Sequence, residues 1–167
     1  MLNLFSRCKT LKSNADRLYA AVVTRAREPV FFVKFAVPDT IDGRFDLLTL
    51  HAWLLLAHLQ TDPAAAALAQ AFVDRLFIGF DEALREQGGG DVGMGRRMKK
   101  FAAAFYGRLK AYDEAQDHAA MEKALTRNLY RGVEEAAAGA MAVYVLGAKQ
   151  HLSLTPEGVV DFGALPV

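Results

Sequence analysis

The sequence predicts an all-α fold: a single-domain bundle of five to six helices with an extended C-terminal tail. Apolar residues recur at spacings of three and four over most of the chain, which is the pattern of helices with one buried face. The stretch 45–59 is apolar on most sides, as expected of a helix that other helices surround. The segment 30–37 has the composition of a strand, but no second strong strand follows, so an extended or irregular segment is an equal alternative.

The length and composition are those of one folded domain. The chain has 167 residues, 53% of them hydrophobic and 23% charged, with a formal net charge of +1. Because the net charge is close to zero, composition gives no general reason to expect nucleic acid or an anionic membrane as a partner. The one cysteine, Cys8, excludes a disulfide bond within the chain and suits a reducing compartment.

We expect residues 1–13 to form a flexible basic arm ahead of a helical domain at 14–150. The arm lacks the continuous apolar run of a secretory signal. Asn14 is expected to cap a first helix over 14–27, which Pro29 ends.

The central helix is expected over about 45–60. It is too short and too polar to span a bilayer, which needs about 20 apolar residues, and no other stretch is expected to span one. The next boundary is clear, because Asp62 can cap a helix whose first position is Pro63. Residues 151–167 contain two prolines and two glycines and are expected to form an extended tail. The remaining helices are expected at 63–86, 91–116, 118–130 and 133–148.

His51, His58 and Asp62 are the best arrangement of metal-ligand residue types in the sequence. Their spacings of seven and four place them near one line of a helix. Seven residues span roughly 10.5 Å along the axis, which is too far for two ligands of one ion. We favour a hydrogen-bonded His51 near a helix junction and a capping Asp62, so no metal site is predicted. The alternative is a small all-α enzyme or ligand-binding domain with a pocket near His51 and His58.

No arrangement for nucleophilic or acid–base catalysis is visible. Cys8 lies in the expected arm with no histidine near it in sequence, and the carboxylates are scattered or gathered in polar stretches such as 113–117. We therefore predict no catalytic residue, no enzyme activity and no cofactor.

Positive charge is concentrated in the helix expected at 91–116. From Arg96 to Lys110 there are six basic residues and no acidic one, beside a stripe of methionine and aromatic residues. Most charged faces are only solvated, but such a face can also bind ribosomal phosphates, lipid headgroups or the acidic loops of a protein. Gly107 lies within this helix, where glycine costs about 1 kcal/mol relative to alanine. It is either a tolerated defect or a point of close backbone approach.

Four phrases of the sequence occur together in one known family. They are Pro38–Asp39–Thr40, Gly43–Arg44–Phe45–Asp46, Asp91–Val92–Gly93–Met94–Gly95 with Arg97–Met98–Lys99, and Phe105–Tyr106–Gly107–Arg108 with Ala111–Tyr112. Together they resemble the ubiquinol–cytochrome c chaperone family, in the branch found in alphaproteobacteria and related to a mitochondrial assembly factor of complex III. The resemblance covers 14–150, and 91–112 is its most specific part.

The resemblance implies a non-catalytic assembly chaperone that binds newly made cytochrome b and promotes assembly of ubiquinol–cytochrome c reductase, respiratory complex III. The implied partners are nascent cytochrome b, a ribosome or inner-membrane surface, and a small partner protein, with no specific nucleic acid sequence. No metal or cofactor is implied. The implied location is the cytoplasm or the periphery of the inner membrane, or the mitochondrion if the source is eukaryotic.

Two candidate surfaces are predicted on this basis. The residues of a partner-binding surface are Asp91, Gly95, Arg96, Arg97, Met98, Lys99, Lys100, Tyr106, Gly107, Arg108 and Tyr112. The residues of an apolar client groove are Trp53, Leu54, Met94 and Met98. Methionine is an adaptable contact and a helical client needs an apolar groove, although methionines at helical spacing more often lie in the core. An exposed groove beside the basic residues would favour the chaperone, and a closed cavity with converging polar groups would favour the enzyme or ligand-binding alternative.

Overall fold

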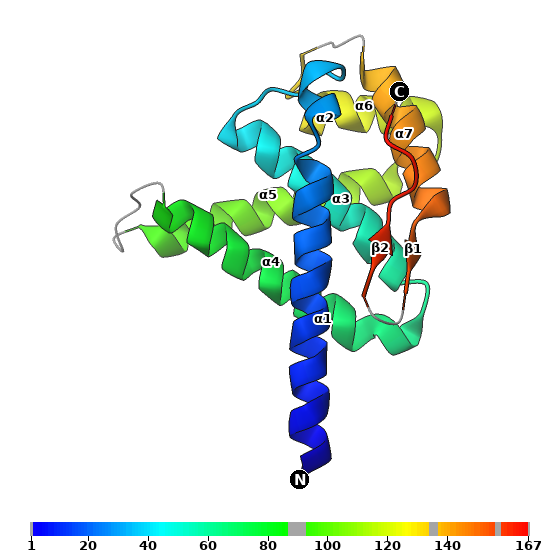
Figure 1. Cartoon of the computed structure of the whole chain (residues 1–167). Coiled ribbons are helices and arrows are strands. Elements are labelled where there is room, and N and C mark those ends of the chain that lie inside the picture. The colour runs from blue at the N-terminus through cyan, green and yellow to red at the C-terminus, as the bar shows by residue number, and fades with distance from the viewer. Residues whose placement is uncertain (1, 87–92, 134–136, 156–157, 167) are drawn as a thin grey trace.

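The computed structural model describes residues 2–86, 93–133, 137–155 and 158–166, with side chains from Lys9 onward. Most of these residues are helical, which confirms the predicted all-α class (Figure 1). In chain order the elements are α1 (Leu2–Ala26), α2 (Pro29–Val33), α3 (Ile41–Leu59), a short 3-10 turn (Pro63–Ala65), α4 (Ala66–Glu86), α5 (Met94–Glu114), α6 (His118–Asn128), α7 (Ala137–His151), β1 (Ser153–Leu154) and β2 (Val160–Asp161).

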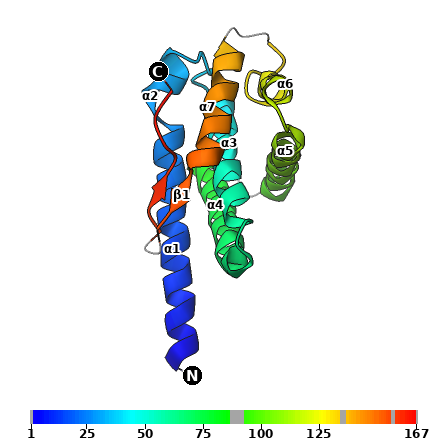
Figure 2. The same cartoon turned by 90° about the vertical axis from the view of Figure 1, so that its right-hand side faces the viewer.

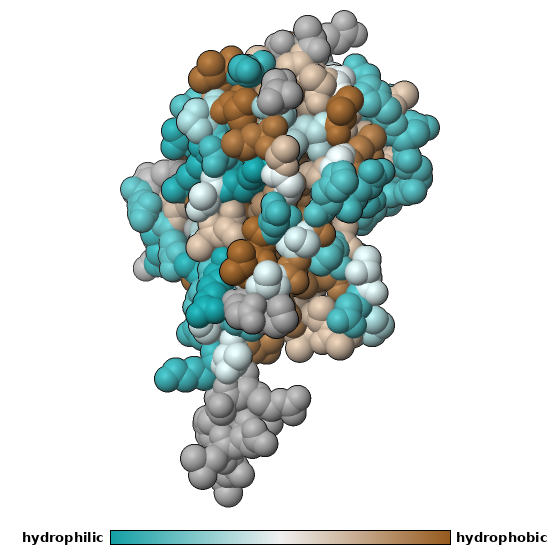
Figure 3. All heavy atoms as spheres, turned by 45° about the vertical axis from the view of Figure 1, so that its right-hand side comes forward, coloured by the Kyte–Doolittle hydropathy of each residue, from teal (hydrophilic) through white to brown (hydrophobic). Residues whose placement is uncertain are grey.

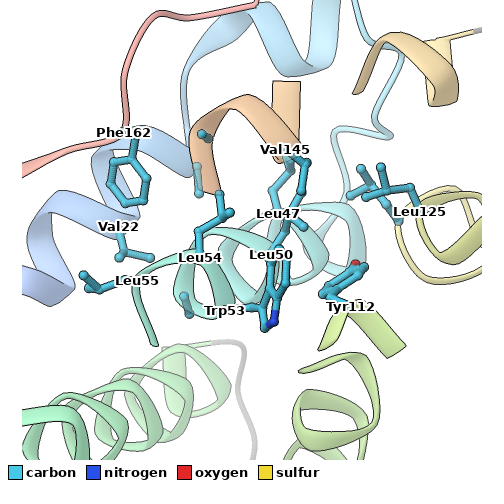
Figure 4. Packing of buried hydrophobic residues seen from close by; sticks show 14 of the residues in the cluster. Val22, Leu47, Leu50, Trp53, Leu54, Leu55, Tyr112, Leu125, Val145 and Phe162 are labelled. Carbon is cyan, nitrogen blue, oxygen red and sulfur yellow. The ribbon is translucent and has the colours of Figure 1, made fainter. Parts of the chain in front are cut away.

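Helix α3 lies at the centre of the bundle, as the sequence predicted. It contacts α1, α4, α5 and α7, and two views at right angles show these helices around it (Figures 1 and 2). Figure 4 shows Leu47, Leu50, Trp53, Leu54 and Leu55 of α3 among residues from α1, α5, α6, α7 and the C-terminal tail. All five are almost completely buried, so this one helix contributes core contacts on nearly every side.

Short polar caps set the boundaries of the elements next to α3. The Thr40 hydroxyl accepts a hydrogen bond from the Gly43 backbone N–H at 3.1 Å, which caps the start of α3. Gly43 is required there, because a Cβ would overlap the carbonyl group of Pro38. After α3, the Asp62 carboxylate accepts a hydrogen bond from the Ala64 backbone N–H at 2.9 Å, which confirms the predicted cap.

Two segments near the N-terminus differ from the sequence prediction. The first helix begins at Leu2, so Asn14 lies inside α1 and residues 2–13 are its first turns, where a separate arm was expected. No proline or glycine in that segment interrupts the helix. The segment 30–37 was expected as a strand or irregular segment, but its first part belongs to the short helix α2 (Pro29–Val33), with Pro29 in the first turn and Phe31 buried. The expected domain boundaries at 14 and 150 stay predictions.

Helix α4 packs closely along α1. Gly79 faces Tyr19 of α1 so closely that a Cβ on Gly79 would overlap the hydroxyl group and the ring of Tyr19. Among the described residues, the stretch Pro63–Glu86 is long and apolar enough to cross a membrane by length and composition alone, which the sequence analysis had not expected. Within the bundle, Phe72 and Leu76 of this helix are fully buried, so its apolar side serves the core.

The C-terminal tail is extended and attached to the bundle. β1 and β2 pair antiparallel, with Ser153 opposite Asp161. Phe162 is buried in the core, and the Arg25 guanidinium of α1 donates hydrogen bonds to the backbone carbonyl groups of Gly163 at 3.1 Å and Ala164 at 2.8 Å. The predicted extended tail is therefore observed, with α1 and the core holding its second half.

Candidate functional site

Helix α5 carries the basic cluster on its exposed side. It begins at Met94 after Gly93, three residues later than predicted, and Asp91 lies outside the described residues. Met94, Phe105 and Tyr112 of α5 are buried, so the opposite side of the helix faces solvent. The exposed cations, here called the basic face, are Arg96, Arg97, Lys99 and Lys100. None of the four forms an ion pair within the part of the chain that the structure describes.

The other residues predicted on α5 divide between the surface and the interior. Gly95 and Gly107 are exposed, and nothing lies within 4 Å of the position that a Cβ on Gly107 would take. The idea of a close backbone approach at Gly107 was therefore wrong. The Tyr106 side chain is 52% exposed and stacks on Phe77, with ring centroids 6.0 Å apart. Tyr112 is fully buried, so it belongs to the core and presents no surface to a partner.

An apolar groove with a volume of about 310 Å³ opens between α1, α3, α4 and α5. Three aromatic rings from different helices pack together along it: the ring centroid of Phe45 lies 5.3 Å from that of Phe80 and 4.9 Å from that of Phe101. Small side chains on α1 and α4 leave the space above these rings. The lining residues are Tyr19, Val23, Ala26, Arg27, Ile41, Arg44, Phe45, Leu48, Gly79, Phe80, Ala83, Leu84, Glu86 and Phe101.

Cations border this groove at three points. Arg27, in the turn after α1, and Arg44 of α3 line it, together with the acidic residue Glu86; Arg44 is paired with Asp39 at 2.7 Å. Arg97 lies four positions before Phe101, the aromatic residue that α5 contributes to the groove, so the two lie on the same side of that helix. Arg97 therefore connects the basic face to the groove, and the two together form one surface with an apolar centre and charged residues of both signs along its border.

The groove is not the one that the sequence predicted. Trp53 and Leu54 are each 1% exposed and Met94 is 7% exposed, so all three belong to the core. Met98 is half-buried and packs against the core. Trp53 also donates its indole N–H to the carboxylate of Asp113 at 2.7 Å. The prediction failed because Trp53 and Leu54 lie on enclosed sides of α3, whereas Ile41, Phe45 and Leu48 of the same helix line the observed groove.

A buried ion-pair cluster connects α3 to α5, and the sequence analysis missed it. Asp46 of α3 is 0% exposed, and its carboxylate lies 2.8 Å from the guanidinium of Arg108 and 3.0 Å from that of Arg131. Burial raises the pKa of Asp46 to about 6, although both arginines act to lower it. Arg108 is thus an internal partner of Asp46, where a free cation of the partner-binding surface was expected. The available signal was an acidic residue inside an otherwise apolar helix.

His51 is part of the core. Its Nδ1–H donates to the Leu47 carbonyl at 2.8 Å, and because a carbonyl can only accept, Nε2 accepts from the Tyr144 hydroxyl at 2.9 Å. Burial, with a smaller contribution from the charge of Arg25, lowers the pKa of His51 to about 4, although the hydrogen bond to the Leu47 carbonyl acts to raise it. The predicted hydrogen bonding of His51 is confirmed, but the residue lies in the middle of α3 and in the core, where a place near a helix junction was expected. Within the described ranges, no group of three or more His, Cys, Asp and Glu residues could hold a metal ion.

A second cavity, of about 350 Å³, lies between α7 and the C-terminal tail. On this side of the molecule, apolar residues gather in patches that hydrophilic residues separate (Figure 3). Neither this cavity nor the apolar groove is lined by His51 or His58. The alternative of a pocket near those two histidines therefore gains no support from the described residues.

An all-α bundle with an apolar groove beside exposed cations has a surface suited to binding another polypeptide. The family model described as Ubiquinol-cytochrome C chaperone matches residues 33–160 of this sequence. The chain therefore belongs to the ubiquinol-cytochrome C chaperone family, which confirms the resemblance seen in the sequence phrases.

Two individual proteins are similar to the chain. Ubiquinol-cytochrome-c reductase complex assembly factor 1 of Xenopus laevis is 27% identical over 122 residues, which are 71% of this chain and 61% of that relative's length. The chain thus spans less than two thirds of that relative. The crystal structure of the Cbp3 homolog from Brucella abortus superimposes with a TM-score of 0.79 at 41% sequence identity, covering 89% of this chain and 86% of the other.

Proposed function

We propose that this protein is an assembly chaperone of ubiquinol–cytochrome c reductase and that its client is newly made cytochrome b. The family assignment supports the assembly role, as does similarity to a relative whose name is that of a complex assembly factor. The observation that carries the proposal is the apolar groove bordered by the basic face. Most of this surface, from Ile41 to Phe101, falls within the matched residues 33–160.

The two parts of the surface have different tasks in this proposal. The groove, with the rings of Phe45, Phe80 and Phe101, takes an apolar side of a client helix before that helix enters the membrane. The basic face attracts acidic loops of the client, or the phosphates of the ribosome that makes it, and mainly raises the rate of association. A small partner protein and the surface of the inner membrane are further proposed contacts, and the proposed location is the cytoplasm at that membrane.

We propose no catalytic role for the protein. His51, the most central histidine, is fully buried with both ring nitrogens hydrogen-bonded, so it cannot reach a substrate. The family contributes the same expectation, since its description is that of a chaperone.

Charge reversal on the basic face tests the proposal. The variant is Arg97→Glu with Lys99→Glu, and the matched control is Lys123→Glu with Arg127→Glu, two exposed cations of α6 that do not line the groove. Both changes in the test variant fall near the start of α5, where acidic residues favour the helix dipole, so stability should hold. Exposed substitutions usually alter stability by less than about 0.5 kcal/mol.

The expected result is reduced capture of cytochrome b and reduced complex III assembly in cells of the native source with the test variant only. The loss should be largest at low salt, because charge attraction is screened at high salt. Equal capture by test, control and unaltered protein, with equal melting temperatures, would refute the role of the basic face. A fall in capture matched by a fall in melting temperature would count against it as well, since stability alone would then explain the loss.

A further inference from the structure

The buried carboxylate of Asp46 joins three parts of the chain. One of its oxygens, Oδ1, lies 2.8 Å from a terminal nitrogen of Arg108 on α5. The other, Oδ2, accepts a hydrogen bond from Nε of Arg131 at 3.0 Å and lies 3.0 Å from a terminal nitrogen of the same guanidinium. Arg131 follows α6, and it also reaches the exposed carboxylate of Asp42, one turn before Asp46, at 3.3 Å. One buried charge on α3 thus contacts α5 and the turn between α6 and α7.

The backbone at Arg131 adopts a conformation that non-glycine residues seldom use. Its φ is 56°, in the left-handed region, and the next residue, Gly132, has a φ of 82°. A residue held in this region is strained relative to ordinary conformations and persists when its surroundings fix it. The backbone hydrogen bond from the Gly132 N–H to the Thr126 carbonyl at 2.8 Å closes α6 through this left-handed residue, and the contacts of the guanidinium with Asp46 add to its fixation.

Helices α3 and α5 both carry buried polar groups among their apolar contacts. Four buried side-chain atoms in the described part of the chain make no hydrogen bond: Asp46 Oδ1, Thr49 Oγ1, Arg108 Nε and Tyr112 OH. Two of them belong to α3 and two to α5. Buried polar groups without a hydrogen bond cost stability, whereas the Asp46–Arg108 pair at 2.8 Å favours the one relative position of the two helices that keeps the buried charges together. A purely apolar contact would discriminate less sharply between positions.

We propose that Asp46 is a positioning residue that fixes the place of α5 on α3, and with it the basic face and the α5 wall of the groove. Arg108 supplies the contact on α5, and Arg131 couples the same carboxylate to the turn after α6. The proposal rests on the proposed function only for what the basic face does once it is in place. The positioning itself stands on the burial of Asp46 and its distances to the two guanidinium groups.

Replacing Asp46 by asparagine removes the charge and keeps the shape. We expect backbone amides of α5 to exchange hydrogen about tenfold faster or more in Asp46→Asn, because the substitution removes the buried ion pair that ties Arg108 of α5 to α3. Exchange in α1 and α4 should stay unchanged. The matched control is Asp16→Asn, which breaks an exposed pair with Arg75 at 3.0 Å between α1 and α4. The control should leave exchange in α5 as it is in the unaltered protein.

A second variant separates positioning from stability. Asp46→Leu with Arg108→Met removes the buried pair and fills the space with apolar atoms, an exchange that often leaves stability unchanged or improves it. The expected result is a folded protein whose melting temperature is held while α5 exchanges faster and capture of cytochrome b falls. Slow exchange in α5, equal to the unaltered protein, in either folded variant would overturn the positioning role.

The readouts also distinguish this inference from the proposed function. Faster exchange in α5 with full capture of cytochrome b would support positioning by Asp46 and would refute recognition through the basic face. Unchanged exchange in α5 of the Asp46 variants, together with reduced capture by the charge-reversal variant, would refute positioning by Asp46 and would support recognition through the basic face. Faster exchange and reduced capture together would support both.

Discussion

Acidification should remove a defined part of the folding free energy through His51. The imidazole is fully buried and neutral, with Nδ1–H donating to Leu47 and Nε2 accepting from Tyr144. The Tyr144 hydroxyl in turn accepts from Arg25 at 3.0 Å, so a proton on Nε2 would place a second positive charge beside the guanidinium. Burial accordingly lowers the pKa of His51 from 6.5 to about 4.

The sign and size of the effect follow from these two pKa values. Between pH 6.5 and about 4 the unfolded chain binds a proton at this histidine and the folded chain does not, so the free energy of unfolding falls as pH falls. One pKa unit corresponds to about 1.4 kcal/mol, so the full loss is about 3 kcal/mol. Asp46 acts in the opposite direction, because its pKa is raised from 3.8 to about 6 and the folded state therefore binds a proton first. Protonation of this carboxyl group therefore raises the free energy of unfolding by about 3 kcal/mol as pH falls from about 6 to 3.8.

Two variants should expose the opposing contributions. We compare the unaltered protein with His51→Gln and Asp46→Asn by urea denaturation at pH 7, 6, 5 and 4, followed by circular dichroism. The stability advantage of the unaltered protein over His51→Gln should shrink by about 3 kcal/mol between pH 7 and pH 4. Asp46→Asn should lose stability on acidification faster than the unaltered protein does. A difference between unaltered protein and His51→Gln that stays constant over this range would refute the assignment of a buried, neutral His51.

Two further predictions concern packing. Gly79→Ala should destabilise the protein, because overpacking against Tyr19 costs about 1–3 kcal/mol, whereas the better helix propensity of alanine contributes about 1 kcal/mol. Urea denaturation should show the loss of stability, and adding Tyr19→Leu to the same chain should relieve it. Trp53→Phe should lower the free energy of unfolding by about 1–2 kcal/mol, since it removes the indole hydrogen bond to Asp113 and part of the packing. A melting temperature equal to that of the unaltered protein would argue against that hydrogen bond.

Local signals in the sequence were enough to predict the bundle and its centre. The apolar character of 45–59 predicted that α3 would be surrounded, and Asp62 before Pro63 predicted the cap that the structure has. These features depend on residues a few positions apart, which a sequence displays directly. The spacing of apolar residues likewise predicted a helix at α5, although Met94, assigned to the client groove, is buried.

Features that depend on distant residues were missed or misplaced. The groove needs α1, α3, α4 and α5 to converge, so Phe45 and Phe80 could not be paired in advance and the groove was assigned to Trp53 and Leu54 of the enclosed α3. The partner of Arg108 is 62 positions earlier, at Asp46, and no spacing rule connects them. The family phrases contained both residues, but the phrases gave no indication that they meet.

Site-specific photo-crosslinking in cells that assemble complex III tests the central claim most directly. A photoreactive amino acid replaces Ile41, which is 58% exposed at the groove, or Val159, which is 61% exposed and lines neither the groove nor the second cavity. The proposed function predicts a crosslinked product that contains cytochrome b, formed from position 41 during its synthesis and not from position 159. No cytochrome b at position 41, or equal amounts at both positions, would contradict the proposal that the groove holds this client.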